Sequence, residues 1–130
     1  MRLLLDTHFV VWLAVDEARL TKEECALVRR GDVEIVCSAV SLWELRLKWN
    51  RTTLEGVPKG PASPDAVMDF GRNMDWTFVP LLPAHAVTAL DVPVAHRDPF
   101  DELLLVQAQV EGLRLLTRDS KLRAHPLALS

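Results

Sequence analysis

The sequence predicts an α/β fold, a three-layer α/β/α sandwich around a central parallel sheet. Short apolar runs, typical of strands buried on both faces, alternate along the chain with segments of helical periodicity. Strands that alternate with helices are joined by crossover connections, and this arrangement favours parallel pairing. With 130 residues, 49% of them hydrophobic, and no repeat or linker, residues 1–130 are interpreted as one domain that closes its own core.

The first predicted strand covers residues 3–5, a run of three leucines that ends at Asp6. From Thr7 the pattern becomes helical, and either Asp6 or Thr7 is able to cap this helix. A second helix is expected over residues 21–30, because acids stand near its start, arginines stand at its end, and Gly31 follows.

The middle of the chain continues the alternation of strands and helices. Residues 33–37 are expected to form the second strand, and Ser38 begins another helix. Residues 52–64 are rich in glycine and proline and are interpreted as a loop. A helix is expected over residues 64–74 and a short strand over residues 77–82.

The last part of the chain repeats the helix and strand pattern. We expect a small helix over residues 83–90, a polar connection up to Pro99, and a strongly apolar helix over residues 100–110 that Gly112 ends. Residues 113–117 are the last clear strand, and Asp119 follows directly.

Composition excludes several classes of protein. The net charge of −3 argues against a broad basic face for nucleic acid, although bound divalent cations would offset that charge. Cys25 and Cys37 lack the spacing of a zinc site and are predicted to be free thiols. The longest apolar stretch, residues 9–15, is too short to span a bilayer, and Asp6 interrupts any signal-peptide core, so a cytoplasmic protein is expected.

Four carboxylates are expected at one end of the sheet. Asp6 and Asp119 each follow a predicted strand, and ligand sites of parallel α/β sheets lie beyond the carboxyl ends of the strands. Asp101 stands at a predicted helix start, and Glu44 stands on the helix that follows the second strand. Like charges this close repel, and a divalent cation is the common means of offsetting the repulsion.

Each of these acids also has a purely structural interpretation. Asp6 could only cap a helix, and Asp119 could start one. Asp98 fits an N-cap with Pro99 at the first helical position, so Asp101 could simply complement the helix dipole. The same spacing would let Asp101 reach a metal while Asp98 supports it or binds through water.

Glu44 is the most ambiguous of the four. It completes a capping box if the helix begins at Ser41. If Ser38 is the cap instead, Glu44 lies inside the helix among apolar residues, where a carboxylate is rarely left unpaired.

Taken together, the acids indicate a site for Mg²⁺ or Mn²⁺, which prefer oxygen ligands and retain several waters. Such a metal would activate a water molecule and neutralise charge on a phosphodiester. The histidines fall in no nucleophile motif, and the five glycines form no phosphate-binding loop.

Four sequence motifs follow one another from the start of the chain to about residue 123. They are LLLDTH at residues 3–8, SAVSLWEL at 38–45, HRDPFDELLLVQA at 96–108 and LLTRD at 115–119. As a set, in this order, they resemble the PIN domain, specifically the VapC-type toxins of bacterial toxin–antitoxin pairs. Two departures stand out: Glu102 where many relatives carry arginine, and Phe9 where a smaller residue is common, which is expected to alter packing.

The resemblance implies a magnesium- or manganese-dependent endoribonuclease. Its catalytic and metal-binding acids would be Asp6, Glu44, Asp101 and Asp119, with Asp98 as a possible fifth metal ligand. It further implies a homodimer that a small antitoxin protein holds inactive, with RNA as the substrate.

Basic residues at two places are candidates for RNA binding. Trp49 lies among basic residues, a mixture typical of sites for single strands, although a solvated helix face explains it equally. The segment after Asp119 could position phosphates or could be an ordinary charged terminal helix. The RNA-binding candidates are Arg46, Lys48, Arg51, Arg118 and Lys121.

Other functions compatible with the fold are less well supported. A receiver-like binding module needs an aspartate after its middle strand, where this chain has Ser38. A haloacid-type phosphatase needs a D-x-D motif, which His8 breaks. A catalytically silent PIN-like subunit that only binds its partner stays open.

Overall fold

The computed structural model describes residues 1–51, 55–56, 60–94 and 98–129. Part of the predicted loop over residues 52–64 lies outside these ranges, as do His96 and Arg97 of the third motif. Within the described ranges, no helix has the length and apolar character needed to cross a membrane.

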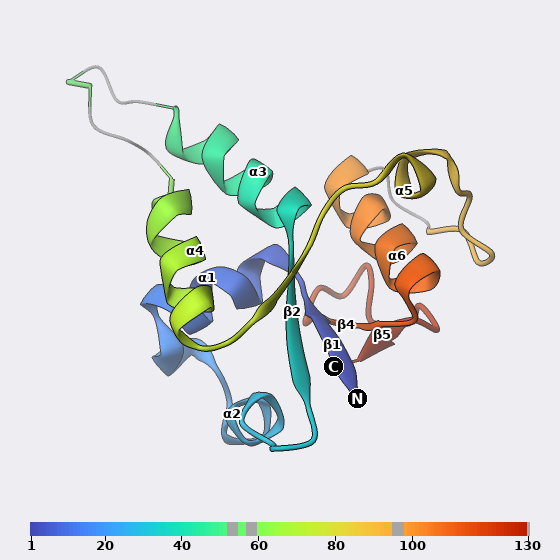
Figure 1. The fold of residues 1–130 in the computed structure, drawn as a ribbon, viewed down its shortest axis with the longest axis horizontal. Helices are drawn as coiled ribbons and strands as arrows, with labels where there is room; N and C mark the ends of the chain where they lie inside the picture. The colour runs from blue at the N-terminus through green and yellow to red at the C-terminus, as the bar shows by residue number, and fades with distance from the viewer. Residues whose placement is uncertain (52–54, 57–59, 95–97, 130) are drawn as a thin grey trace.

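Five parallel strands form one central sheet, in the order β3-β2-β1-β4-β5 (Figure 1). Helices cover both faces of this sheet, so the predicted three-layer α/β/α sandwich is confirmed. The strands are β1 (Arg2–Leu5), β2 (Glu34–Ser38), β3 (Thr77–Val79), β4 (Arg114–Leu116) and β5 (Ala128–Leu129).

β1 is the central strand of the sheet, and this position explains its run of leucines. Leu4 pairs with Val36 of β2 on one side and with Leu115 of β4 on the other. Since both faces of the strand are covered by helices, Leu3, Leu4 and Leu5 are all fully buried. The uninterrupted leucine run is therefore the pattern that this position in a parallel sheet requires.

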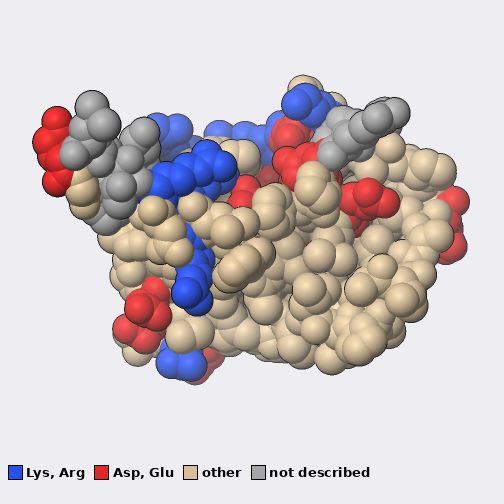
Figure 2. All heavy atoms as spheres, turned by 90° about the horizontal axis from the view of Figure 1, so that it is seen from above, with Lys and Arg blue, Asp and Glu red and all other residues tan. Residues whose placement is uncertain are grey.

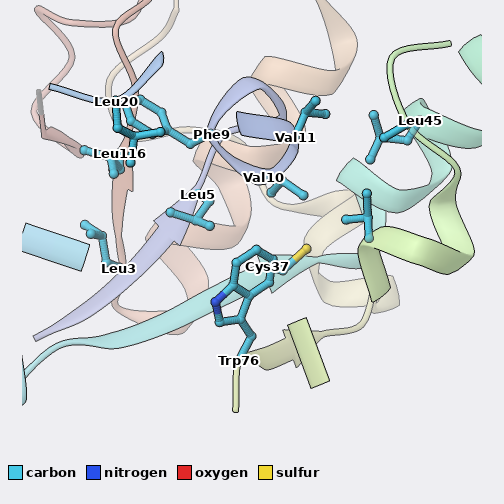
Figure 3. Packing of buried hydrophobic residues seen from close by; sticks show 12 residues of the cluster. Leu3, Leu5, Phe9, Val10, Val11, Leu20, Cys37, Leu45, Trp76 and Leu116 are labelled. Atoms are coloured by element: carbon cyan, nitrogen blue, oxygen red, sulfur yellow. The ribbon is translucent and has the colours of Figure 1, made fainter. Parts of the chain in front are cut away.

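The helices α1 (Thr7–Val15), α2 (Lys22–Val28) and α4 (Pro64–Asn73) pack on one face. Figure 3 shows Phe9 and Val10 of α1 among Leu5, Cys37 and Trp76 in this layer of the core. A short 3₁₀ helix, η1 (Glu17–Arg19), connects α1 to α2. Cys25 and Cys37 are both free thiols, as predicted.

The opposite face is covered chiefly by α6 (Pro99–Glu111), with α5 (Pro83–Val87) beside it. Leu104, Leu105 and Ala108 of α6 are fully buried against the sheet. α3 (Ala39–Trp49) joins the two layers, because its Val40 packs with α6 and its Leu45 packs with α1.

Caps define the helix ends that matter for the site. The Asp6 carboxylate caps α1, and the Ser38 hydroxyl caps α3 by accepting from Val40 N. The choice left open for Glu44 is thereby decided, since Glu44 lies inside α3 and has no capping duty. Asp98 caps α6, which Gly112 ends with a left-handed φ of 69°.

The structure differs from the sequence analysis at several points of regular structure, and the small helix expected over residues 83–90 ends at Val87. The strand predicted over residues 77–82 ends at Val79, because Pro80 has no N–H to donate to a ladder. The segment after Asp119 forms turns where a terminal helix was considered. β5 was missed because two residues are too few to show any periodicity, and its pairing depends on β4 being in place.

Gly71 of α4 lies in close contact with aromatic side chains of the core. A Cβ atom at this position would lie 2.6 Å from Trp76 Cε3 and 2.7 Å from Phe78 Cζ. We expect Gly71→Ala to lower the free energy of unfolding by about 1–2 kcal/mol, because overpacking outweighs the gain in helix propensity. Urea denaturation measures this change. Gly31→Ala is the matched control, since its Cβ would meet nothing within 4 Å, and equal stability of the two variants would contradict the prediction.

Candidate active site

The loops that follow the neighbouring strands β1 and β4 meet at the carboxyl edge of the sheet. They form an open hollow of about 200 Å³. Two carboxylates, two aromatic side chains and one guanidinium line it: Asp6, Asp119, His8, Trp12 and Arg118. The structure therefore brings together the two acids whose positions at strand ends the sequence analysis singled out.

Asp6 is the buried member of this pair, with only 4% of its surface exposed. Its Oδ1 accepts a hydrogen bond from Phe9 N at 3.0 Å, and the Thr117 hydroxyl also bonds to the carboxylate. Burial raises the pKa of Asp6 above its ordinary value, and the negative charge of Asp119 adds to the rise, although these hydrogen bonds and His8 oppose it. Ionised Asp6 is thus held at an energetic cost.

Asp119 is half-buried and is fixed by the turn that it starts. Its backbone N–H donates to the Thr117 hydroxyl at 3.1 Å, and its Oδ1 accepts from Lys121 N at 2.9 Å. Thr117 therefore supports both acids of the hollow, because its hydroxyl also bonds to Asp6.

Glu44 lies close to the start of α1 but is engaged by other groups. Its side chain is 14% exposed, and Lys48 Nζ, one turn further along α3, lies 2.9 Å from Oε2. The Thr7 hydroxyl donates to Oε1 at 2.9 Å. The buried carboxylate is therefore paired within the protein, and the bond to Thr7 connects it to the residue beside Asp6.

Asp98 and Asp101 lie at the start of α6, at the edge of the sheet where β1 leads into α1 (Figure 1). Asp98 is exposed, and its Oδ1 accepts from Phe100 N at 2.9 Å and from Asp101 N at 3.4 Å. Asp101 is half-buried in the first turn, where a carboxylate complements the helix dipole.

The four acids do not converge on one point as expected. In the described part of the chain, no group of three or more histidine, cysteine, aspartate or glutamate side chains could hold a metal ion. The arrangement is a pair, Asp6 and Asp119, because Glu44 turns to Lys48.

The pair nonetheless fits a hard cation. Magnesium is usually bound by one or two carboxylates together with waters and substrate phosphates, so a complete cage of protein ligands is not needed. Burial and the neighbouring carboxylate both oppose ionisation of Asp6 and raise its pKa, and a cation in the hollow would relieve both penalties.

A second hollow, of about 250 Å³, adjoins the first and shares His8 and Trp12 with it. Lys48 and Arg19 line its wall, and each is paired with a carboxylate, Lys48 with Glu44 and Arg19 with Asp16 of the same wall. Figure 2, which looks down on this edge of the molecule, shows acidic side chains near the middle with lysine and arginine side chains beside them. The surface thus has an anionic centre next to a basic margin.

The five basic candidates for RNA binding differ in their surroundings. Arg46, Arg51 and Lys121 are exposed, and Arg46 also lies over the Trp43 ring at 5.7 Å. Lys48 is paired with Glu44, and Arg118 is bonded to Glu24. The last two side chains have acidic partners within the protein.

Sequence reasoning missed three residues that support the site: Thr7, Glu24 and Thr117. Thr7 and Thr117 are buried hydroxyls that bond to the acids, and each adjoins a strand end. Their positions next to Asp6 and next but one to Asp119 in the sequence could have identified them as supports of these acids. Glu24 counted in the sequence analysis only as an acid near a helix start; the structure places it in a capping box with Thr21, and its contact with Arg118 joins distant parts of the chain.

Comparison with protein families gives one match over nearly the whole chain. The family model described as the PIN domain matches residues 3–126. This range contains every acid and every support residue of the site.

Chains similar to this one are found both among individual proteins and among solved structures. Ribonuclease VapC22 of Mycobacterium tuberculosis is 27% identical over 123 residues, which cover 94% of this chain and 90% of that protein. The crystal structure of VapBC2 from Rickettsia felis, bound to a DNA fragment from their promoter, contains a chain of similar fold. The TM-score is 0.65 at 14% identity, over 99% of this chain and 96% of that one.

Proposed function

This chain belongs to the PIN-domain family, and on that premise we propose that it is a metal-dependent endoribonuclease. It cleaves RNA phosphodiesters in the cytoplasm with Mg²⁺ or Mn²⁺ and acts as the toxin of a type II toxin–antitoxin system. The similarity to a protein named ribonuclease VapC22 supports the choice of RNA as substrate.

The observation that carries the proposal is the hollow shared by Asp6 and Asp119. A buried carboxylate with a raised pKa beside a second carboxylate is costly to maintain for stability alone. Such a pair is explained by a site that binds a cation and then a phosphate group. The PIN-domain match over residues 3–126 is consistent with this use of the acids.

We assign the site residues as follows. Asp6 and Asp119 would hold the cation at adjacent strand ends, and we assign Asp101 and Asp98, at the start of α6, as the further acids of the site. When bound, the cation supplies a water molecule as nucleophile and neutralises charge on the phosphate. Glu44 acts beside them through Thr7, which its carboxylate orients at the end of β1.

In this proposal, exposed basic side chains beside the acidic centre bind the RNA backbone. Arg46, Arg51 and Lys121 are exposed and contribute positive charge without a strong acidic partner among the contacts described above. Lys48 lines the second hollow and holds Glu44 in place. Phosphate contacts of this kind confer affinity and leave base selection to the shape of the surface.

The partners in this proposal are a second copy of the chain and a small antitoxin. The R. felis structure is a VapBC2 assembly on promoter DNA, and the shared fold makes a comparable antitoxin partner reasonable for this chain. The antitoxin would hold the enzyme inactive until it is removed.

Cleavage by the purified wild-type chain tests the function. We expect single-stranded RNA to be cut in millimolar Mg²⁺ or Mn²⁺ and to stay intact when a chelator is added, because the acids need a cation to approach a phosphodiester. Gel analysis of an end-labelled RNA measures this. Induction of the chain alone in a bacterium should also arrest growth. Binding of RNA without cleavage under all metal conditions would instead support a catalytically silent subunit.

A further inference from the structure

The guanidinium of Arg118 lies beside the hollow of Asp6 and Asp119 and contacts residues from several segments of the chain. Its Nε donates to Glu24 Oε2 at 2.8 Å, and its Nη2 lies 2.6 Å from Glu24 Oε1. The same Nη2 donates to the carbonyl oxygen of Arg19 at 2.5 Å. The side chain therefore bonds to the end of η1 and to the first turn of α2.

Aromatic rings of α1 complete the surroundings of this group. The guanidinium carbon lies 4.4 Å from the centroid of the Trp12 ring and 5.5 Å from that of the Phe9 ring. Both distances are within the range of cation–π attraction, which favours arginine over the ring face. Arg118 thus connects α1, η1 and α2 to the loop after β4.

The positive charge of Arg118 is paired with a carboxylate of the same chain. Glu24 is only 12% exposed, and its hydrogen bond from Arg118 lowers the pKa of this carboxyl below the ordinary value. Hydrogen bonding to Glu24 in turn raises the pKa of Arg118. A bidentate arginine–carboxylate pair of this kind is stronger and more directional than a single ion pair.

These contacts lie next to the acids of the hollow. Arg118 precedes Asp119 in the chain and itself lines the hollow with Asp6. Asp119 also makes short-range bonds within its own turn: its N–H donates to the Thr117 hydroxyl, its Oδ1 accepts from Lys121 N, and its carbonyl oxygen accepts from Leu122 N and Arg123 N. Those bonds shape the turn, whereas Arg118 fixes the turn against the helices that carry Trp12 and Glu24.

We propose that Arg118 is a positioning residue, whose clamp between Glu24 and Trp12 holds Asp119 at the hollow that it shares with Asp6. The inference rests on the proposed function and deepens it. It also replaces the assignment of Arg118 to RNA phosphate, because its donors and charge are directed to Glu24. Partners that orient a metal ligand typically change metal affinity or activity by about 10–100-fold when they are removed.

Two substitutions test the clamp from its two ends. Arg118→Lys keeps the charge but loses the forked geometry, and Glu24→Gln keeps the shape but loses the charge. We expect each to weaken Mn²⁺ binding by about 10-fold, measured by calorimetry on the protein without RNA. In cleavage assays each should lower kcat at saturating metal and leave KM for RNA unchanged.

Arg30→Lys is the matched control, because Arg30 makes the same forked contact with Asp32 at an exposed position. It should leave Mn²⁺ affinity, kcat and KM at their wild-type values. A raised KM for RNA in Arg118→Lys, with normal Mn²⁺ affinity, would overturn the clamp and return Arg118 to phosphate binding. Lowered thermal stability with unchanged Mn²⁺ affinity in both clamp variants would also overturn it, in favour of a structural ion pair.

The failure of the clamp and the failure of the proposed function give different results. If the wild type binds Mn²⁺ and cleaves RNA while both variants match it, only the clamp is wrong. If the wild type neither binds Mn²⁺ nor cleaves RNA, the proposed function is wrong, and the positioning role of Arg118 is wrong as well.

Discussion

Asp6→Asn should abolish metal-dependent RNA cleavage while leaving the fold intact. Loss of a carboxylate from the cation site removes several kcal/mol of charge stabilisation, which corresponds to a decrease in kcat/KM of about 100-fold or more. Asparagine retains an oxygen that can accept from Phe9 N, so the cap of α1 is preserved. A cleavage assay with end-labelled RNA measures the loss.

For stability we expect the opposite of the effect on cleavage: Asp6→Asn should not weaken the fold. Because burial raises the pKa of Asp6, ionisation of this carboxyl destabilises the folded state, and the neutral amide relieves that cost. Without metal, Asp6→Asn should therefore melt at or above the wild-type temperature. Mg²⁺ should raise the melting temperature of the wild type and not that of the variant.

Asp69→Asn is the control for both measurements. Asp69 is exposed on α4, and its contact with Arg72 at 3.9 Å is of the kind that contributes little. It should cleave RNA and respond to Mg²⁺ as the wild type does. Full activity of Asp6→Asn would remove Asp6 from the site and with it the main support for the proposed mechanism.

Phe9→Ala should cause the largest loss of stability among these substitutions. Phe9 is completely buried, its ring packs edge-on against Trp12 with centroids 5.2 Å apart, and the Arg118 guanidinium lies over it. Removing a buried phenyl ring leaves a cavity and typically costs about 3–5 kcal/mol. That is a large part of the stability of an ordinary domain, so the midpoint of urea denaturation should fall markedly.

Val87→Ala serves as the control, because Val87 is 83% exposed and its truncation removes little buried surface. Its denaturation midpoint should match that of the wild type. A loss below about 1 kcal/mol for Phe9→Ala would mean that the core closes around the missing ring. It would also mean that the departure from the smaller residue common in relatives has little effect on packing.

Most of the fold could be predicted because its signals are local. The leucine run of β1 and the Asp98–Pro99 start of α6 each follow from a few adjacent residues. The family could also be predicted, since the four motifs indicated the PIN domain and the family match over residues 3–126 confirms it. β5 could not be predicted, because a two-residue strand depends entirely on its partner.

The candidate site was predicted less completely. The acids at strand ends were identified, and the structure places Asp6 and Asp119 at one hollow. Glu44 does not line that hollow and is paired with Lys48, one turn away on α3, so its place among the acids of the site stays a prediction. The catalytic and metal-binding assignments themselves stay predictions until the cleavage assays are done.

The sequence by itself determined the order of strands and helices up to β4, the Asp98–Pro99 start of α6 and the acids that follow the strands. These features depend on residues a few positions apart, and their preferences act before the chain is compact. Only the tertiary structure decided which charges distant in the sequence meet: Arg118 with Glu24, and Asp6 with Asp119. Electrostatic energy depends on distance and burial in the folded molecule, and neither is encoded in spacing along the chain.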